Sequence, residues 1–214
     1  MKKQIAGKLK PFHWLLLLAI LVVAYSTYMS IFGDPHASFF LGQKPEDVNQ
    51  VTRSVWLKVL YIHITFACIA TIAGALNFTY KAYATLRKHH KKIGYVYFAS
   101  LLIVDLTSGY MAVYATGGKW SSVPFNLLNI YWIAATVLAI FHIRKNNQEK
   151  HRNWMIRSYV FCFVNFVIHI FTYLLYQLLQ IDYTLSYTLS VYLSLIALLA
   201  ISELLICKLT RKKA

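Results

Sequence analysis

Six long apolar runs, separated by short clusters of charge, constrain the fold of this chain more than any other feature. A bilayer core about 30 Å thick needs roughly 20 helical residues to cross it, and six runs reach that length. They are residues 12–32, 55–80, 93–116, 122–143, 154–180 and 185–207. The 214 residues are 58% hydrophobic and include only seven acids against 22 lysines and arginines. The sequence therefore predicts an all-α, six-span transmembrane helical bundle.

The cations predict the orientation of these spans. Of the 22 lysines and arginines, 18 lie in alternate polar segments, which include both ends of the chain. The positive-inside rule then places both termini in the cytoplasm. A net charge of +15 at helix ends predicts contact with anionic lipid headgroups rather than with nucleic acid. No feature indicates a protein partner. No small-residue cleavage site cleanly follows the first run, so it is expected to be a retained helix.

Small and polar residues recur at helical spacing on the second to fifth runs, which predicts that these four spans form the core. The expected division is residues 1–54 as tail, first span and outer loop, 55–180 as the four-helix membrane core, and 181–214 as sixth span and basic tail. Spans one and six are expected to be peripheral. The three cysteines lie in apolar runs without a CxxC motif, so they are predicted to be packing residues rather than disulfide or metal partners.

Four polar residues on four different spans are predicted to lie at one depth in the membrane. At about 1.5 Å per helical residue, His63, Asp105, Asn129 and His169 all fall slightly outside the midplane. Ionisable groups there are costly and need partners, so we expect Asp105 to face the bundle and to share a hydrogen bond with His63 or His169. Three interpretations stay open: a structural hydrogen-bond network, a haem or metal site, and a proton or substrate pathway.

A second group of histidines lies at the cytoplasmic ends of the spans. His90 and His151 occupy matching positions before the third and fifth runs, so they are candidates for a second ligand pair. In "HKKIGYVY", Gly94 allows close backbone approach one turn after His90, and Tyr97 follows on the same side. The neighbouring His89 and His142 are interpreted as solvated linker residues.

The segment "HRNWMIRSY", residues 151–159, brings several polar side chains to the start of the fifth run. Asn153 is predicted to cap the helix, Trp154 to anchor it at the headgroups, and Arg152 to meet lipid phosphate. Arg157 lies about one turn deeper, where a cation needs a partner or must extend its side chain to the interface.

"HKKIGYVY", "HRNWMIRSY" and "YIHITFACIATIAGALNF" together resemble the signatures of a bacterial multi-pass family, the predicted membrane proteins of domain-of-unknown-function family 2306. The resemblance covers about residues 55–175 and implies no established activity. It implies an arginine near the position of His169, which argues against a ligand role there. The arrangement is also similar, by analogy only, to dihaem b-type cytochromes of the ascorbate-reducing kind. The positions characteristic of the family are His63, His90, His151, Trp154, Met155 and Arg157.

The leading functional hypothesis is a haem-binding or redox membrane protein. It assigns His63 and His169 as an outer ligand pair and His90 and His151 as an inner pair of a b-type haem. Asp105 would orient a ring, and Arg157 would face a propionate or a lipid phosphate. The alternatives are a non-catalytic membrane scaffold or assembly factor with a structural polar core, and a small transporter. The absence of an obvious inverted repeat or paired broken helices argues against the transporter. No sequence motif nominates a catalytic residue.

Overall fold

The computed structural model describes residues 11–42, 50–79 and 84–211, and these residues form helices and no strand. Six helical segments are long and apolar enough to cross a membrane, which confirms the predicted fold class. The cations of residues 1–10, Lys81 and residues 212–214, on which part of the orientation depends, lie outside the described residues. The helices are α1 (Pro11–Tyr28) with the π-helical turn η1 (Met29–Gly33), the short α2 (Ser38–Gly42), α3 (Gln50–Thr79), α4 (Ala84–Ala112), α5 (Lys119–Arg144), a divided fifth span, and α8 (Tyr183–Arg211).

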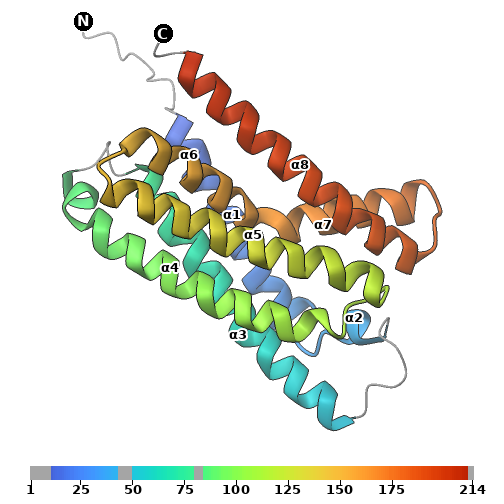
Figure 1. Ribbon diagram of the computed structural model, residues 1–214. Helices are drawn as coiled ribbons and strands as arrows, with labels where there is room; N and C mark the ends of the chain where they lie inside the picture. The colour runs from blue at the N-terminus through green and yellow to red at the C-terminus, as the bar shows by residue number, and fades with distance from the viewer. Residues whose placement is uncertain (1–10, 43–49, 80–83, 212–214) are drawn as a thin grey trace, which may run out of the picture.

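The helices lie roughly along one common direction (Figure 1). The starts of α1 and α4, the α5–α6 turn and the end of α8 lie at the same end of the molecule, defined here as the inner end. α3 and α4 form one hairpin, α5 and α6 form another, and α1 packs against α3. Large apolar side chains cover the outward faces, for example Leu106 at 77% exposure. That distribution is expected where helices face lipid rather than water.

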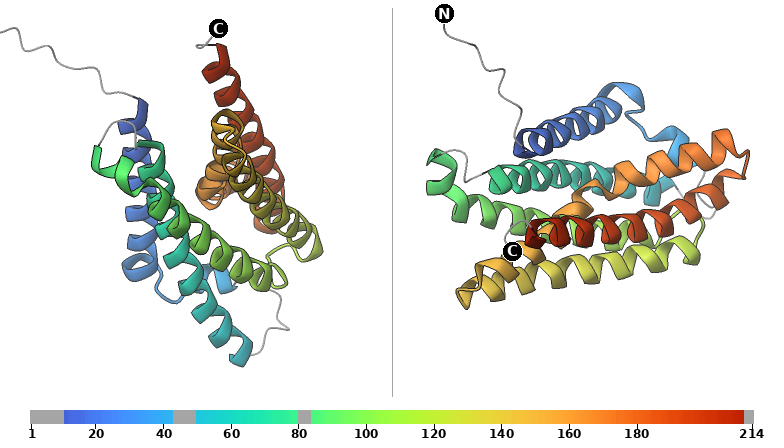
Figure 2. Two further views of the ribbon diagram at one scale, coloured as in Figure 1. Left: turned by 60° about the vertical axis from the view of Figure 1, so that its left-hand side comes forward. Right: turned by 90° about the horizontal axis from the view of Figure 1, so that it is seen from above.

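The fifth span is not the continuous helix that the sequence predicted over residues 154–180. It consists of α6 (Gln148–Tyr159), the 3₁₀ turn η2 (Val160–Phe163), α7 (Val164–Tyr173) and the π-helical turn η3 (Leu174–Leu178). α6 packs along α5, whereas α7 packs along α8 (Figure 2). A 3₁₀ turn inside a helix changes the direction in which the following side chains point, so residues beyond Phe163 do not continue the face of α6.

One helix boundary also differs from the prediction. The third span was expected to begin at residue 93, but α4 begins at Ala84, so His89 and His90 lie on the helix rather than in a linker. The apolar run marks only the part of a helix inside the hydrocarbon, and cationic residues extend it into the headgroup region. Trp56, near the start of α3, is only 2% exposed, whereas Trp120, at the start of α5, is 76% exposed.

The tight turn predicted between the third and fourth spans depends on glycine. Gly117 and Gly118 have φ values of 86° and 59°, a region that residues with a side chain rarely adopt. A Cβ atom on Gly117 would lie 2.1 Å from Thr188 Oγ1 of α8. The turn therefore closes the α4–α5 hairpin directly against the last span.

Candidate functional site

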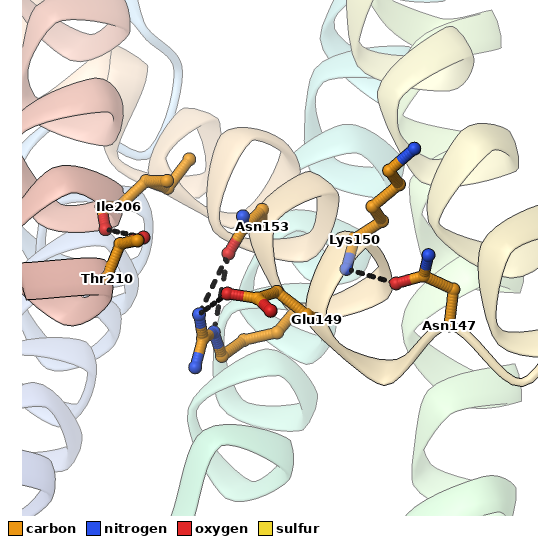
Figure 3. A network of polar contacts seen from close by, with 7 residues as sticks. Asn147, Glu149, Lys150, Asn153, Ile206 and Thr210 are labelled. Carbon is orange, nitrogen blue, oxygen red and sulfur yellow. Dashed lines mark hydrogen bonds and ion pairs between the residues drawn. The ribbon is translucent and has the colours of Figure 1, made fainter. Parts of the chain in front are cut away.

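The motif of residues 151–159 lies on α6, and Figure 3 shows the first turns of this helix with Asn147, Lys150 and Asn153 labelled. Its helix is capped by Asn147, whose Oδ1 accepts a hydrogen bond from Lys150 N at 3.0 Å. The prediction that Asn153 caps the helix is wrong, because the helix begins at Gln148 and Asn153 lies in its second turn. Asn153 Oδ1 instead accepts from Arg152 Nη2 at 3.2 Å, and Arg152 also lies 3.6 Å from Glu149.

Ser158 belongs to a closed ring of hydrogen bonds between α4, α5 and α6. Trp132 Nε1 can only donate, and it donates to Tyr97 OH at 3.4 Å. The Tyr97 hydroxyl then donates to Ser158 Oγ at 2.6 Å, and Ser158 donates to Thr136 Oγ1 at 2.7 Å. Thr136 closes the ring by donating to the backbone oxygen of Trp132 at 2.9 Å. All four residues are buried, so each hydroxyl depends on its neighbour for both of its bonds.

Tyr159, the next residue, links α6 to α3 through a hydrogen bond and through packing of its ring. Its hydroxyl donates to the backbone oxygen of Thr71 at 2.9 Å. Its ring lies directly over Gly74, where a Cβ atom would be 2.2 Å from Tyr159 Cε2. The absence of a side chain at Gly74 therefore permits the close approach of the two helices.

Arg157 forms a two-pronged ion pair with α8. Its Nε donates to Glu203 Oε1 at 2.6 Å and its Nη2 to Glu203 Oε2 at 2.9 Å. The guanidinium also lies 4.6 Å from the centroid of the Trp154 ring. The partner of Arg157 is therefore a protein side chain, that of Glu203. The sequence hypothesis had assigned a haem propionate or a lipid phosphate instead. Glu203 is the single acid of the sixth apolar run, a signal from which the pair could have been predicted.

His151 connects α6 to α5. Its Nδ1 lies 2.9 Å from the backbone oxygen of Ala139, and because a carbonyl only accepts, Nδ1 carries the proton. Four residues of the motif thus each bond to another span: His151 to α5, Arg157 to α8, Ser158 to α4 and α5, and Tyr159 to α3. We call these four residues the interhelix set.

Of the predicted inner pair, His90 lies near the start of α4 and His151 near the start of α6, within electrostatic range of each other. Between α3 and α4, the Asn77 amide has one orientation that suits all its neighbours: its oxygen accepts from Gly94 N at 3.0 Å. Its nitrogen then donates to His90 Nδ1 at 3.2 Å and to the His90 backbone oxygen at 3.1 Å.

The predicted outer group does not form one contact network. His63 Nδ1 lies 3.0 Å from Thr107 Oγ1, whose own proton is donated to the backbone oxygen of Ile103, so His63 is the donor. His169 is exposed on α7, which the η2 turn directs onto α8.

Asp105 is half-buried, and its Oδ1 is buried without a hydrogen-bond partner. Among the residues that the structure describes, no direct hydrogen bond or ion pair joins Asp105 to His63 or His169. A contact through water stays a prediction. Asn129 is buried on α5.

The described residues contain no group of three or more His, Cys, Asp or Glu side chains that could hold a metal ion. The three cysteines are free thiols; Cys68 and Cys162 are half-buried, whereas Cys207 is exposed. An apolar groove of about 400 Å³ lies on α1, α3 and α4, and a polar pocket of about 360 Å³ lies at the turn before α8. The residues that line these two cavities include no histidine.

A model of one protein family, described as predicted membrane protein (DUF2306), matches residues 60–206. The matched region contains the interhelix set, Asn77, His90 and Glu203. Searches of curated proteins and of solved structures found no match.

Proposed function

Because the chain belongs to the DUF2306 family of predicted membrane proteins, we propose that it acts as a membrane scaffold or assembly factor whose intramembrane polar residues are structural. The observation that carries this proposal is the interhelix set. Each of its four residues bonds to another span, so the most polar segment near the membrane is occupied in holding helices together. In lipid, polar contacts and close packing replace the hydrophobic effect as the force between helices.

The proposal includes an orientation. The inner end faces the cytoplasm of a bacterial inner membrane, where the cations at the span ends meet anionic headgroups. Residues 55–180 act as the core that α1 and α8 complete. Arg152 is the motif residue best placed for a headgroup, since its side chain is bonded only within its own helix, to Asn153 and Glu149.

A second candidate function is the binding of a b-type haem, favoured by the proximity of His90 and His151. Two imidazoles fall short of the roughly four ligands of a structural zinc site. They suffice for a haem, whose ring supplies four nitrogens and which provides one-electron chemistry when bound. His151 suits a ligand role, because a proton on Nδ1 bonded to a carbonyl leaves Nε2 as the lone-pair donor.

The other three histidines weaken this second candidate. His90 has the opposite arrangement, since Asn77 donates to its Nδ1. His63 has a suitable Nδ1 proton, but its proposed partner His169 is exposed on α7. Neither pair therefore fits two-histidine ligation as arranged, and Asp105 orients neither ring. A transporter ranks third: the fifth span is broken at η2, but inverted-repeat transporters use a pair of broken helices.

The test is the visible absorption spectrum of the protein, purified after expression with added haem. The scaffold proposal predicts no Soret band that depends on the histidines. A Soret band that His90→Ala and His151→Ala each abolish, in variants that remain folded, would contradict the proposal and establish the second candidate.

A further inference from the structure

We infer that Asn77 is a positioning residue that holds His90 in the tautomer opposite to that of His151, with the proton of neutral His90 on Nε2 and that of neutral His151 on Nδ1. The inference concerns the protonation of the site itself and does not depend on the scaffold proposal. It also locates the disagreement with the haem hypothesis in one side chain.

The tautomer of His151 follows from its partner. The backbone oxygen of Ala139 offers lone pairs and no proton, so the 2.9 Å contact requires an N–H at His151 Nδ1. The neutral ring then carries no proton on Nε2.

The tautomer of His90 follows from the Asn77 amide, whose orientation the backbone fixes. Gly94 N–H is a donor and must face the amide oxygen, while the His90 backbone oxygen is an acceptor and must face the amide nitrogen. The same nitrogen reaches His90 Nδ1 at 3.2 Å, so Nδ1 accepts. Turning the amide over would set oxygen against oxygen and N–H against N–H at the two backbone contacts.

The residues around the Asn77 amide leave room for it and keep it in place. His90 and Gly94 are the i and i+4 positions of one helical turn, and Asn77 bonds to the carbonyl of the first and the N–H of the second. A Cβ atom on Gly94 would lie 3.4 Å from the nearer end of the Asn77 amide, so the amide packs directly against this turn of α4. Asn77 itself is 8% exposed, which keeps competing water away.

Opposite tautomers do not suit the two rings to a shared iron. Ligand histidines that bind through Nε2 carry their proton on Nδ1, with an acceptor beside it. His151 has that acceptor, whereas His90 faces a donor.

The direct measurement is the ¹⁵N NMR spectrum of the full-length protein labelled at histidine, in nanodiscs at a pH where both rings are neutral. His90→Gln and His151→Gln assign the two signals. We expect the Nε2–H pattern for His90 and the Nδ1–H pattern for His151. An Nδ1–H pattern at His90 would overturn the inference.

Asn77→Leu tests the role of Asn77 in the same spectrum. Leucine supplies no donor to His90 Nδ1, so the His90 signal should lose its preference for Nε2–H, while His151 keeps the Nδ1–H pattern. An unchanged His90 pattern in Asn77→Leu would overturn the role of Asn77. If Asn77→Leu fails to fold, the wild-type NMR pattern decides alone.

Discussion

Arg152 and Arg157 lie five residues apart on α6 and have different surroundings. Arg152 bonds to Asn153 and Glu149 of its own helix, near the headgroups. Arg157 lies deeper and bonds with two nitrogens to Glu203 of α8. Paired N–H donors of a guanidinium match a carboxylate better than a lysine would, so the second arginine contributes to the attachment of the last span.

We therefore expect Arg157→Leu to destabilise the protein more than Arg152→Leu, because it leaves Glu203 as an unpaired charge near the membrane. The measurement is the free energy of unfolding in detergent. A double-mutant cycle with Glu203→Gln should give a coupling of about 0.5–3 kcal/mol, as for residues in contact. Equal tolerance of the two single variants, with no coupling, would show that Arg157 is not held by Glu203.

At the scale of helices, the fifth span shows what the sequence pattern could and could not predict. Apolar run lengths predicted six spans, because the bilayer sets that length. The break at η2 was not predictable from hydropathy, since Val160–Phe163 is apolar and leads without a polar residue into the equally apolar start of α7. The turn accompanies a change of packing partner, from α5 to α8, and that is a tertiary effect. Because the break was not predicted, the position predicted for His169 was also wrong.

The α3–α6 contact provides a prediction at this scale. Gly74→Ala should destabilise the bundle by about 1–3 kcal/mol, the usual range for overpacking, because the added Cβ would lie 2.2 Å from the Tyr159 ring. Gly109→Ala is the matched control, since a Cβ there meets nothing within 4 Å. Similar unfolding free energies for the two variants would mean that α3 and α6 are not in this close contact.

At the scale of the whole molecule, the distribution of lysines and arginines predicts the membrane topology. Hydrogen bonds between polar side chains join the helices to one another. The proximity of His90 and His151 was predictable, because both precede apolar runs that begin at the same side. The ring around Ser158 was not, since Trp132 and Thr136 lie among ordinary apolar residues and their bonds appear only when three helices meet.

The orientation predicts the behaviour of reporter fusions. A reporter active only in the periplasm should be active when fused after Lys119, at the outer turn, and inactive when fused after Lys150, at the inner turn. Activity is measured in intact cells, with expression of both fusions checked by blotting. The reverse pattern would invert the orientation, and with it the proposed contact of the inner end with cytoplasmic headgroups.

The most direct test of the central claim, that the motif's polar residues hold the spans together, is the free energy of unfolding of Ser158→Ala. Losing this hydroxyl leaves Tyr97 OH without its acceptor and Thr136 without its donor inside the bundle. We predict a loss of about 1–3 kcal/mol, the cost of unsatisfied buried polar groups. Ser190→Ala is the control, because Ser190 is equally buried but its hydroxyl bonds to Ser186 of its own helix. A Ser158→Ala variant as stable as the control would contradict the claim.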